Sequence, residues 1–299
     1  MANLIAEVRG LVYLAYLTFR RQALARKSAI AVILASMLVL GVYTWSIRRV
    51  PEILEDQTKA KAAQADLDEA GENMEERRER RERGRPKVKR TPQEEILLEF
   101  ALEIVMGIFV TFLAPLLTLI YATSAFGDER EDRTLVYLLT RPLARWRIYL
   151  AKALGIAPLV LLVVLGAYVG ICLVGGEPGR GVLYRFLPGL ALGTIAYTAL
   201  FLFFGAVAPR PLIMSVVYTF LVETLVGNMP GTLKRMALSY HTRCLLFDAG
   251  KEIGVVPYNP RHFLPISTSA ATWVLLAVTA FFLLWGAIAF QRREYRDLA

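Results

Sequence analysis

The sequence predicts an all-α integral membrane protein with six transmembrane helices. Hydrophobic residues make up 56% of its 299 residues and charged residues only 20%. The mean hydropathy of +0.45 is above that of an ordinary soluble domain. Six apolar runs approach the length that crosses about 30 Å of hydrocarbon. They cover residues 29–47, 104–126, 153–174, 186–208, 212–226 and 270–290.

Residues 1–27 predict an amphipathic helix that lies in the plane of the membrane ahead of the first span, 28–47. Leu4, Val8 and Leu11 belong to an apolar set at helical spacing, and basic residues gather near the end of the segment. A simple basic flank is the alternative. No small-residue cleavage site follows the first apolar run, so we expect a retained span instead of a signal peptide.

Residues 48–95 form a charged arm, with 13 Lys plus Arg against 13 Asp plus Glu. Glu and Arg neighbours at spacings of three and four predict a solvated helical insertion, and a disordered segment is the alternative. Thr91, Pro92 and Glu94 form a capping box with proline at the first helical position. The second membrane helix is therefore predicted to begin near Pro92.

This second helix exceeds the bilayer, because 35 residues from Pro92 to Phe126 span about 52 Å. Its first turns must project into water. Glu95, Glu99 and Glu103 are spaced by four and share one face of that projecting end. We interpret them as solvated, and a proton relay is the alternative.

Residues 127–142 predict a short capped helix between the second and third spans. Gly127 ends the second span, Asp128 and Glu131 form another capping box, and Pro142 ends the short helix. Glu129 and Arg133 are spaced to pair on its charged surface. Its apolar side consists of Leu135, Leu138 and Leu139. Such a rigid element would transmit a push from a soluble partner to the attached spans.

The residues of this stretch also carry a family resemblance. They are Asp128, Glu129, Arg130, Glu131, Asp132, Arg133, Thr134, Leu135, Leu138, Leu139, Arg141 and Pro142, followed by Arg145, Trp146 and Lys152. The pattern resembles the signature of ABC-2 type ABC transporter permeases, with Arg133 where that family commonly has glycine. The amphipathic N-terminal helix, the six spans, the turn at 209–211 and the closing "AFQRREY" are similar to the same family.

The resemblance implies the membrane subunit of an ATP-driven exporter that forms a permease dimer. It implies that 127–142 is a coupling helix docking on an ABC ATPase subunit, through the twelve residues named from Asp128 to Pro142. It also implies that 92–299 holds the remaining five spans and a partly inserted outer hairpin at 227–268. We expect a multi-pass protein of the cell membrane, a bacterial inner membrane, with both termini cytoplasmic and the arm external. Counts of Lys and Arg do not fix this orientation, because the result reverses when the arm is left out.

The motor is expected on another chain. The 299 residues contain no phosphate-binding G-x-x-x-x-G-K-[ST] pattern. We therefore expect ATP and Mg²⁺ on the partner ATPase, with no cofactor and no catalytic residues here. The alternative is a non-transporting anchor or scaffold of an ABC-type complex, with the arm binding an external partner. Basic residues beside the spans account for the net charge of +9, so nucleic-acid binding is not expected.

Few polar residues in or near the spans are candidates for a site. Glu223, in the fifth run, is assigned either to the translocation path or to the water at the outer mouth. His241, Cys244 and Asp248 offer too few ligands to predict a metal site. Cys172 and Cys244 do not form a disulfide framework. The nearly uncharged spans are compatible with lipids, amphipathic drugs, glycans or peptides as the substrate.

Overall fold

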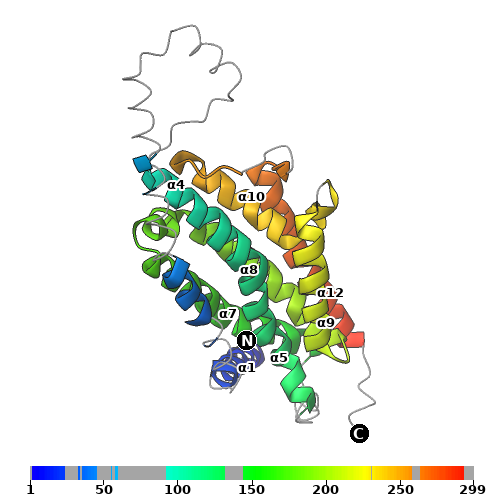
Figure 1. Ribbon diagram of the computed structural model, residues 1–299. Helices are drawn as coiled ribbons and strands as arrows, with labels where there is room; N and C mark the ends of the chain where they lie inside the picture. The colour runs from blue at the N-terminus through cyan, green and yellow to red at the C-terminus, as the bar shows by residue number, and fades with distance from the viewer. Residues whose placement is uncertain are drawn as a thin grey trace, which may run out of the picture.

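The computed structural model describes residues 2–23, 33, 36–45, 55, 58–59, 92–131, 144–229, 231–257 and 263–292. All regular elements in this part of the chain are helices, which confirms the all-α class there (Figure 1). The principal helices are α1 (Ala2–Ala23), α4 (Pro92–Glu99), η1 (Phe100–Leu113), α5 (Ala114–Glu131), α7 (Arg145–Val174), α8 (Glu177–Val207), α9 (Pro211–Tyr218), η2 (Thr219–Leu225), α10 (Leu238–Gly250) and α12 (Thr268–Arg292). Short 3₁₀ turns are η3 (Val226–Asn228), η4 (Leu233–Met236) and η5 (Lys251–Ile253).

Five helical segments of the described residues are long and apolar enough to cross a membrane. They are Gln93–Glu129, Arg145–Val174, Glu177–Val207, Pro211–Asn228 and Thr268–Arg292. These segments coincide with the second to sixth predicted spans. Of the first predicted span, only residues 33 and 36–45 are described, and they are helical. Most of the charged arm lies outside the described residues. In Figure 1, α1 and the C-terminal end of α12 lie toward one end of the molecule, and α4 lies toward the other.

The second span is one continuous helix made of α4, η1 and α5. Its described part begins at Pro92, and Glu95 and Glu103 are exposed, as expected for a projecting end. Thr91, the first residue of the predicted capping box, lies outside the described residues. The middle section, η1, is a π-helix. Within it, the side-chain hydroxyl of Thr111 donates a hydrogen bond to the carbonyl of Met106, five residues back, at 2.8 Å.

The predicted break at Gly127 is wrong, because the helix continues through this residue to Glu131. A glycine inside a helix costs only about 1 kcal/mol, which a packed helix tolerates. A Cβ at Gly127 would lie 3.5 Å from the ring of Pro211, which is an ordinary contact distance, so this position packs beside the start of α9 without requiring a glycine. The capping box of Asp128 and Glu131 therefore does not begin a new helix.

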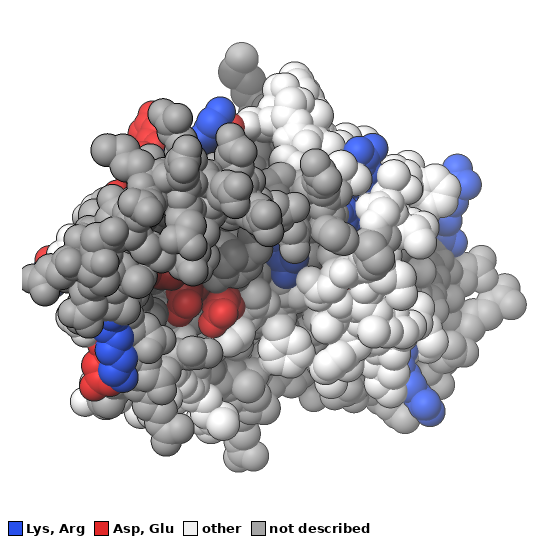
Figure 2. Space-filling model, turned by 45° about the horizontal axis from the view of Figure 1, so that its top comes forward, with Lys and Arg blue, Asp and Glu red and all other residues white. Residues whose placement is uncertain are grey.

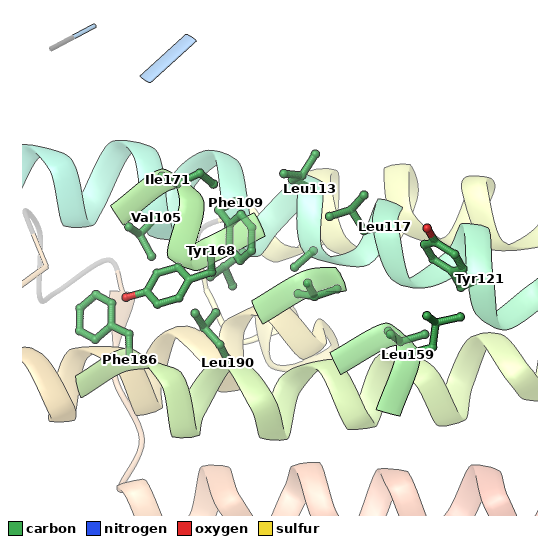
Figure 3. Close-up of a cluster of buried hydrophobic side chains, with 14 of the residues drawn as sticks. Val105, Phe109, Leu113, Leu117, Tyr121, Leu159, Tyr168, Ile171, Phe186 and Leu190 are labelled. Carbon is green, nitrogen blue, oxygen red and sulfur yellow. The ribbon is translucent and has the colours of Figure 1, made fainter. Parts of the chain in front are cut away.

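The core lies between the second span, α7 and α8 (Figure 3). Phe109 of η1 packs on Tyr168 of α7 with ring centroids 5.8 Å apart. The hydroxyl of Tyr168 donates to the carbonyl of Val182 at 3.0 Å, so a buried tyrosine also links α7 to α8. Phe186 and Leu190 of α8 complete this layer. Glycines allow other helices to approach closely, as they do in membrane bundles generally.

Helix α10 runs antiparallel to α8 and packs tightly along it. Gly250 faces Phe186, Gly189 faces Leu246, and Gly193 faces Thr242, so residue numbers rise along one helix as they fall along the other. Helix α8 has 31 residues and is about 46 Å long. Gly193 is near the middle of α8, so the first half of α10 packs against the middle of this membrane-spanning helix.

Candidate functional site: polar clusters at two depths

Only the edges of the predicted coupling region belong to the described part of the chain. Asp128, Glu129, Arg130 and Glu131 form the last turn of α5. Asp132, Arg133, Thr134, Leu135, Leu138, Leu139, Arg141 and Pro142 lie outside the described residues. The region is therefore framed by the end of α5 and by α7, which begins at Arg145.

Lys152 joins these two helices. Its side chain, on α7, is completely buried. Its ammonium donates hydrogen bonds to the carboxylate of Glu129 and, at 2.5 Å, to the carbonyl of Ala125, both on α5. The same ammonium lies 4.4 Å from the ring centroid of Phe126. The buried charge is thus surrounded by a carboxylate, a carbonyl and an aromatic face, which together offset its loss of water.

Helix α1 completes the cluster. The guanidinium of Arg21 lies 3.9 Å from the other carboxylate oxygen of Glu129. One residue later, the amide oxygen of Gln22 accepts a hydrogen bond from the hydroxyl of Ser124 at 2.7 Å, with both side chains buried. We call Arg21, Gln22, Ser124, Glu129 and Lys152 the three-helix polar cluster.

Close backbone packing supports this cluster. A Cβ at Gly155 of α7 would lie 2.4 Å from the carbonyl oxygen of Ala15, so α1 crosses α7 almost in backbone contact. Exposed Val12, Tyr13 and Tyr16 cover the opposite side of α1. One face of α1 thus packs on the bundle and the other carries exposed apolar side chains, whereas the position of α1 in the plane of a membrane stays a prediction.

The geometry favours an internal role for Glu129. One of its oxygens faces Lys152 and the other faces Arg21, so the side chain ties α5 to both neighbours. Sequence analysis placed Glu129 among the ATPase-docking residues and Lys152 only at the head of a span. It could not find this ion pair, because the partners are 23 residues apart and belong to different helices.

Glu223 occupies a second buried site, deeper in the bundle. Its carboxylate accepts hydrogen bonds from the hydroxyl of Tyr218 at 2.8 Å and from the backbone N–H groups of Leu238 and Ser239 at 3.0 and 2.9 Å. Leu238 and Ser239 are the first two residues of α10, and the preceding Ala237 has no side-chain acceptor. Glu223 therefore caps α10 from another helix. The carboxylate is fully buried, so the alternative that it faces outer water is wrong.

His241 and Cys244 lie on α10, and both side chains are buried. The Nε2 of His241 lies 2.8 Å from the carbonyl of Arg235, where it donates a hydrogen bond. Burial lowers the pKa of His241 and raises the pKa of the Cys244 thiol. No group of three or more His, Cys, Asp or Glu side chains suited to a metal ion occurs among the described residues.

Arg243 was not singled out from the sequence. It lies on α10, and its guanidinium donates to the carbonyl of Met106 at 3.2 Å, to the hydroxyl of Thr111, and to the side-chain oxygen of Asn228 at 3.3 Å. It thus connects α10 to η1 and to the end of the fifth span. No sequence signal identifies it, because the 227–268 segment looks like an outer loop in the linear sequence.

Comparison with known families accounts for most of the chain. Residues 21–295 match the model of a family described as ABC-2 family transporter protein. The match includes both polar clusters and the predicted coupling region. No curated protein matches the chain significantly.

Proposed function

Because the chain belongs to the ABC-2 family of transporter proteins, we propose that it is the membrane-spanning permease subunit of an ATP-driven exporter. The family match over residues 21–295 is the observation that carries this proposal. Five apolar helices of spanning length agree with it. The 299 residues have no phosphate-binding loop, so the energy comes from a separate ABC ATPase, which holds ATP and Mg²⁺.

In this proposal, the ATPase docks on residues 127–142. Leu135, Leu138 and Leu139 provide the apolar contact, the charged residues from Asp128 to Arg133 surround it, and Arg141 with Pro142 sets the angle of the lever. Displacement of this element moves the end of α5 and the start of α7. The buried ion pair of Glu129 and Lys152 resists separation of α5 from α7, and the buried hydrogen bond between Ser124 and Gln22 links α1 to α5.

The proposed assembly contains two permease chains and two ATPase subunits in the cell membrane. The permease contributes six spans, and both of its termini face the cytoplasm. The position of α1 and of the C-terminal end of α12 toward one end of the molecule supports placing both termini on the same side of the membrane (Figure 1).

The test is affinity purification of the tagged full chain from its native host in mild detergent, followed by mass spectrometry. We expect an ABC ATPase to copurify with the native chain and to be lost with Leu135→Asp. Leu233→Asp is the matched control, because Leu233 is an exposed leucine of η4, outside the proposed docking residues 127–142. Absence of an ATPase from well-folded native chain would reject the transporter assembly. An ATPase retained by Leu135→Asp would reject the docking surface.

A further inference from the structure

Arg243 is a cation placed at an unusual depth. Its neighbour Thr242 faces Gly193, near the middle of α8, and its own partners Met106 and Thr111 lie near the middle of the continuous helix Pro92–Glu131. Within the predicted apolar runs 104–126 and 186–208, Thr111 and Gly193 each lie seven residues from the start, which is about 10 Å along the helix axis and inside a hydrocarbon core of about 30 Å. Two spans therefore independently place Arg243 within the depth of the hydrocarbon core.

The partners of this guanidinium are all neutral. It binds a carbonyl, a hydroxyl and an amide oxygen, and no carboxylate of the described residues lies within ion-pairing distance. The buried Glu223 is close enough to act through its field, but its oxygens are occupied by Tyr218 and the α10 backbone. The five N–H groups of an arginine exceed the three bonds made here. Both charge and donors thus remain available.

The surroundings suit an amphiphile. Arg243 itself is partly exposed, and Gly107 of η1 and Asn228 beside it are exposed. Exposed Ile108, Leu225 and Met229 flank these positions. An arginine at this depth faces a polar cavity or a substrate route in preference to lipid, because a charge in hydrocarbon is costly.

We propose that Arg243 lines the translocation route and binds the anionic headgroup of a transported amphiphile, a phosphate being the best fit to its forked donors. This inference rests on the proposed transport function and adds a substrate class to it. The neutral anchors hold the guanidinium between η1, α10 and the fifth span without neutralising it. An anion that reaches this depth gains a charge-assisted hydrogen bond there, while its apolar chain contacts the exposed aliphatic side chains.

Binding of radiolabelled dodecyl phosphate to the purified full chain in an uncharged detergent tests the proposal. We expect native chain and Arg243→Lys to bind it, and Arg243→Gln to bind at least about tenfold more weakly, because one charge-assisted hydrogen-bonding group is lost. Arg185→Gln is the matched control. Arg185 is an exposed cation of α8 that pairs with Glu252 at 2.7 Å, and its loss removes the same charge without affecting the site.

Two further probes use the native chain and so do not depend on the folding of a variant. Dodecyltrimethylammonium has the same chain with a cationic headgroup, and we expect it not to compete. Competition by inorganic phosphate alone would show that the headgroup suffices for binding. Failure of phosphate to compete would show that the alkyl chain is also recognised. Both results support the anion site. Equal binding of the cationic amphiphile, or unchanged binding by folded Arg243→Gln, would overturn the proposal. No ATPase takes part, so failure here is distinct from failure of ATPase recovery.

Discussion

Removing the carboxylate of Glu129 should destabilise the protein more than removing the ammonium of Lys152. The side chain of Lys152 is 0% exposed, whereas that of Glu129 is 17% exposed and keeps Arg21 nearby. Glu129→Gln leaves a buried ammonium without the carboxylate that it hydrogen-bonds, so that Asp128 is the negative charge left to act on it. Breaking a buried ion pair in this way costs about 3–5 kcal/mol, and the remaining carbonyl and aromatic contacts place the expected cost at the lower end.

Lys152→Met should cost only about 1–3 kcal/mol, because the remaining carboxylate is partly hydrated and a methionine fills the buried volume. The double variant removes both charges. Replacing both partners of a buried pair is often nearly neutral, so the double variant should be more stable than the sum of the single losses predicts. We expect a coupling energy of about 2 kcal/mol or more, within the range of directly contacting residues.

The assay is reversible unfolding of the full chain by SDS in mixed micelles, followed by tryptophan fluorescence, for the native chain and the three variants. The Arg185 and Glu252 pair provides a matched cycle, because its side chains are 39% and 81% exposed. An exposed pair contributes only about 0–1 kcal/mol. If the two single losses at Glu129 and Lys152 add to the double loss within about 0.5 kcal/mol, the cluster is not energetically coupled and our reasoning is refuted.

Three other predictions follow from the described contacts and from the proposed topology. Glu223→Gln should cost about 1–3 kcal/mol in the same unfolding assay, because the amide NH₂ replaces an acceptor opposite a backbone N–H of α10, and a native-like stability would contradict the cap. Native stability should fall as pH drops below about 6.5. The reason is that His241 of the unfolded chain then binds a proton, whereas the buried ring, with its lowered pKa, binds one only at lower pH. His241→Gln should weaken this pH dependence, and an unchanged profile would argue against it. A cysteine at Gln64 in the arm should react with an impermeant maleimide in intact cells, whereas labelling only after lysis would reverse the topology.

The spans were predictable from the sequence because their signal is local. Continuous apolar runs identify helices that cross hydrocarbon, and five of the six predicted runs form helices of that length. The predicted start at Pro92 also rests on a local pattern, a capping box of residues three apart, and it stays a prediction because Thr91 lies outside the described residues. Gly127 misled the prediction, because a glycine costs a packed helix only about 1 kcal/mol and does not by itself end it.

The polar contacts were not predictable, because each joins residues remote in sequence. Glu129 meets Lys152 across 23 residues, Glu223 caps a helix that begins 15 residues later, and Arg243 binds Met106 across 137 residues. A charge near a span indicates that a partner is needed, but not which one. From the sequence, Glu223 was assigned either to the translocation path or to the outer water, and neither assignment included its role as the cap of α10.

The three-helix polar cluster and Arg243 both contact the long helix Pro92–Glu131, and this relation suggests how the proposed transporter is coupled. Glu129 lies near the cytoplasmic end in our assignment, and Thr111, a partner of Arg243, lies 18 residues earlier, about 27 Å along the axis. A displacement at the coupling region would thus be carried by one helix to the proposed anion site. The π-helix η1 and Pro115 lie where that helix reaches Arg243, and both features weaken regular helical hydrogen bonding. Glu223 holds the start of α10 in place. Bending of the long helix would therefore move Met106 and Thr111 relative to α10. This movement would change which donors of Arg243 are available to an anion.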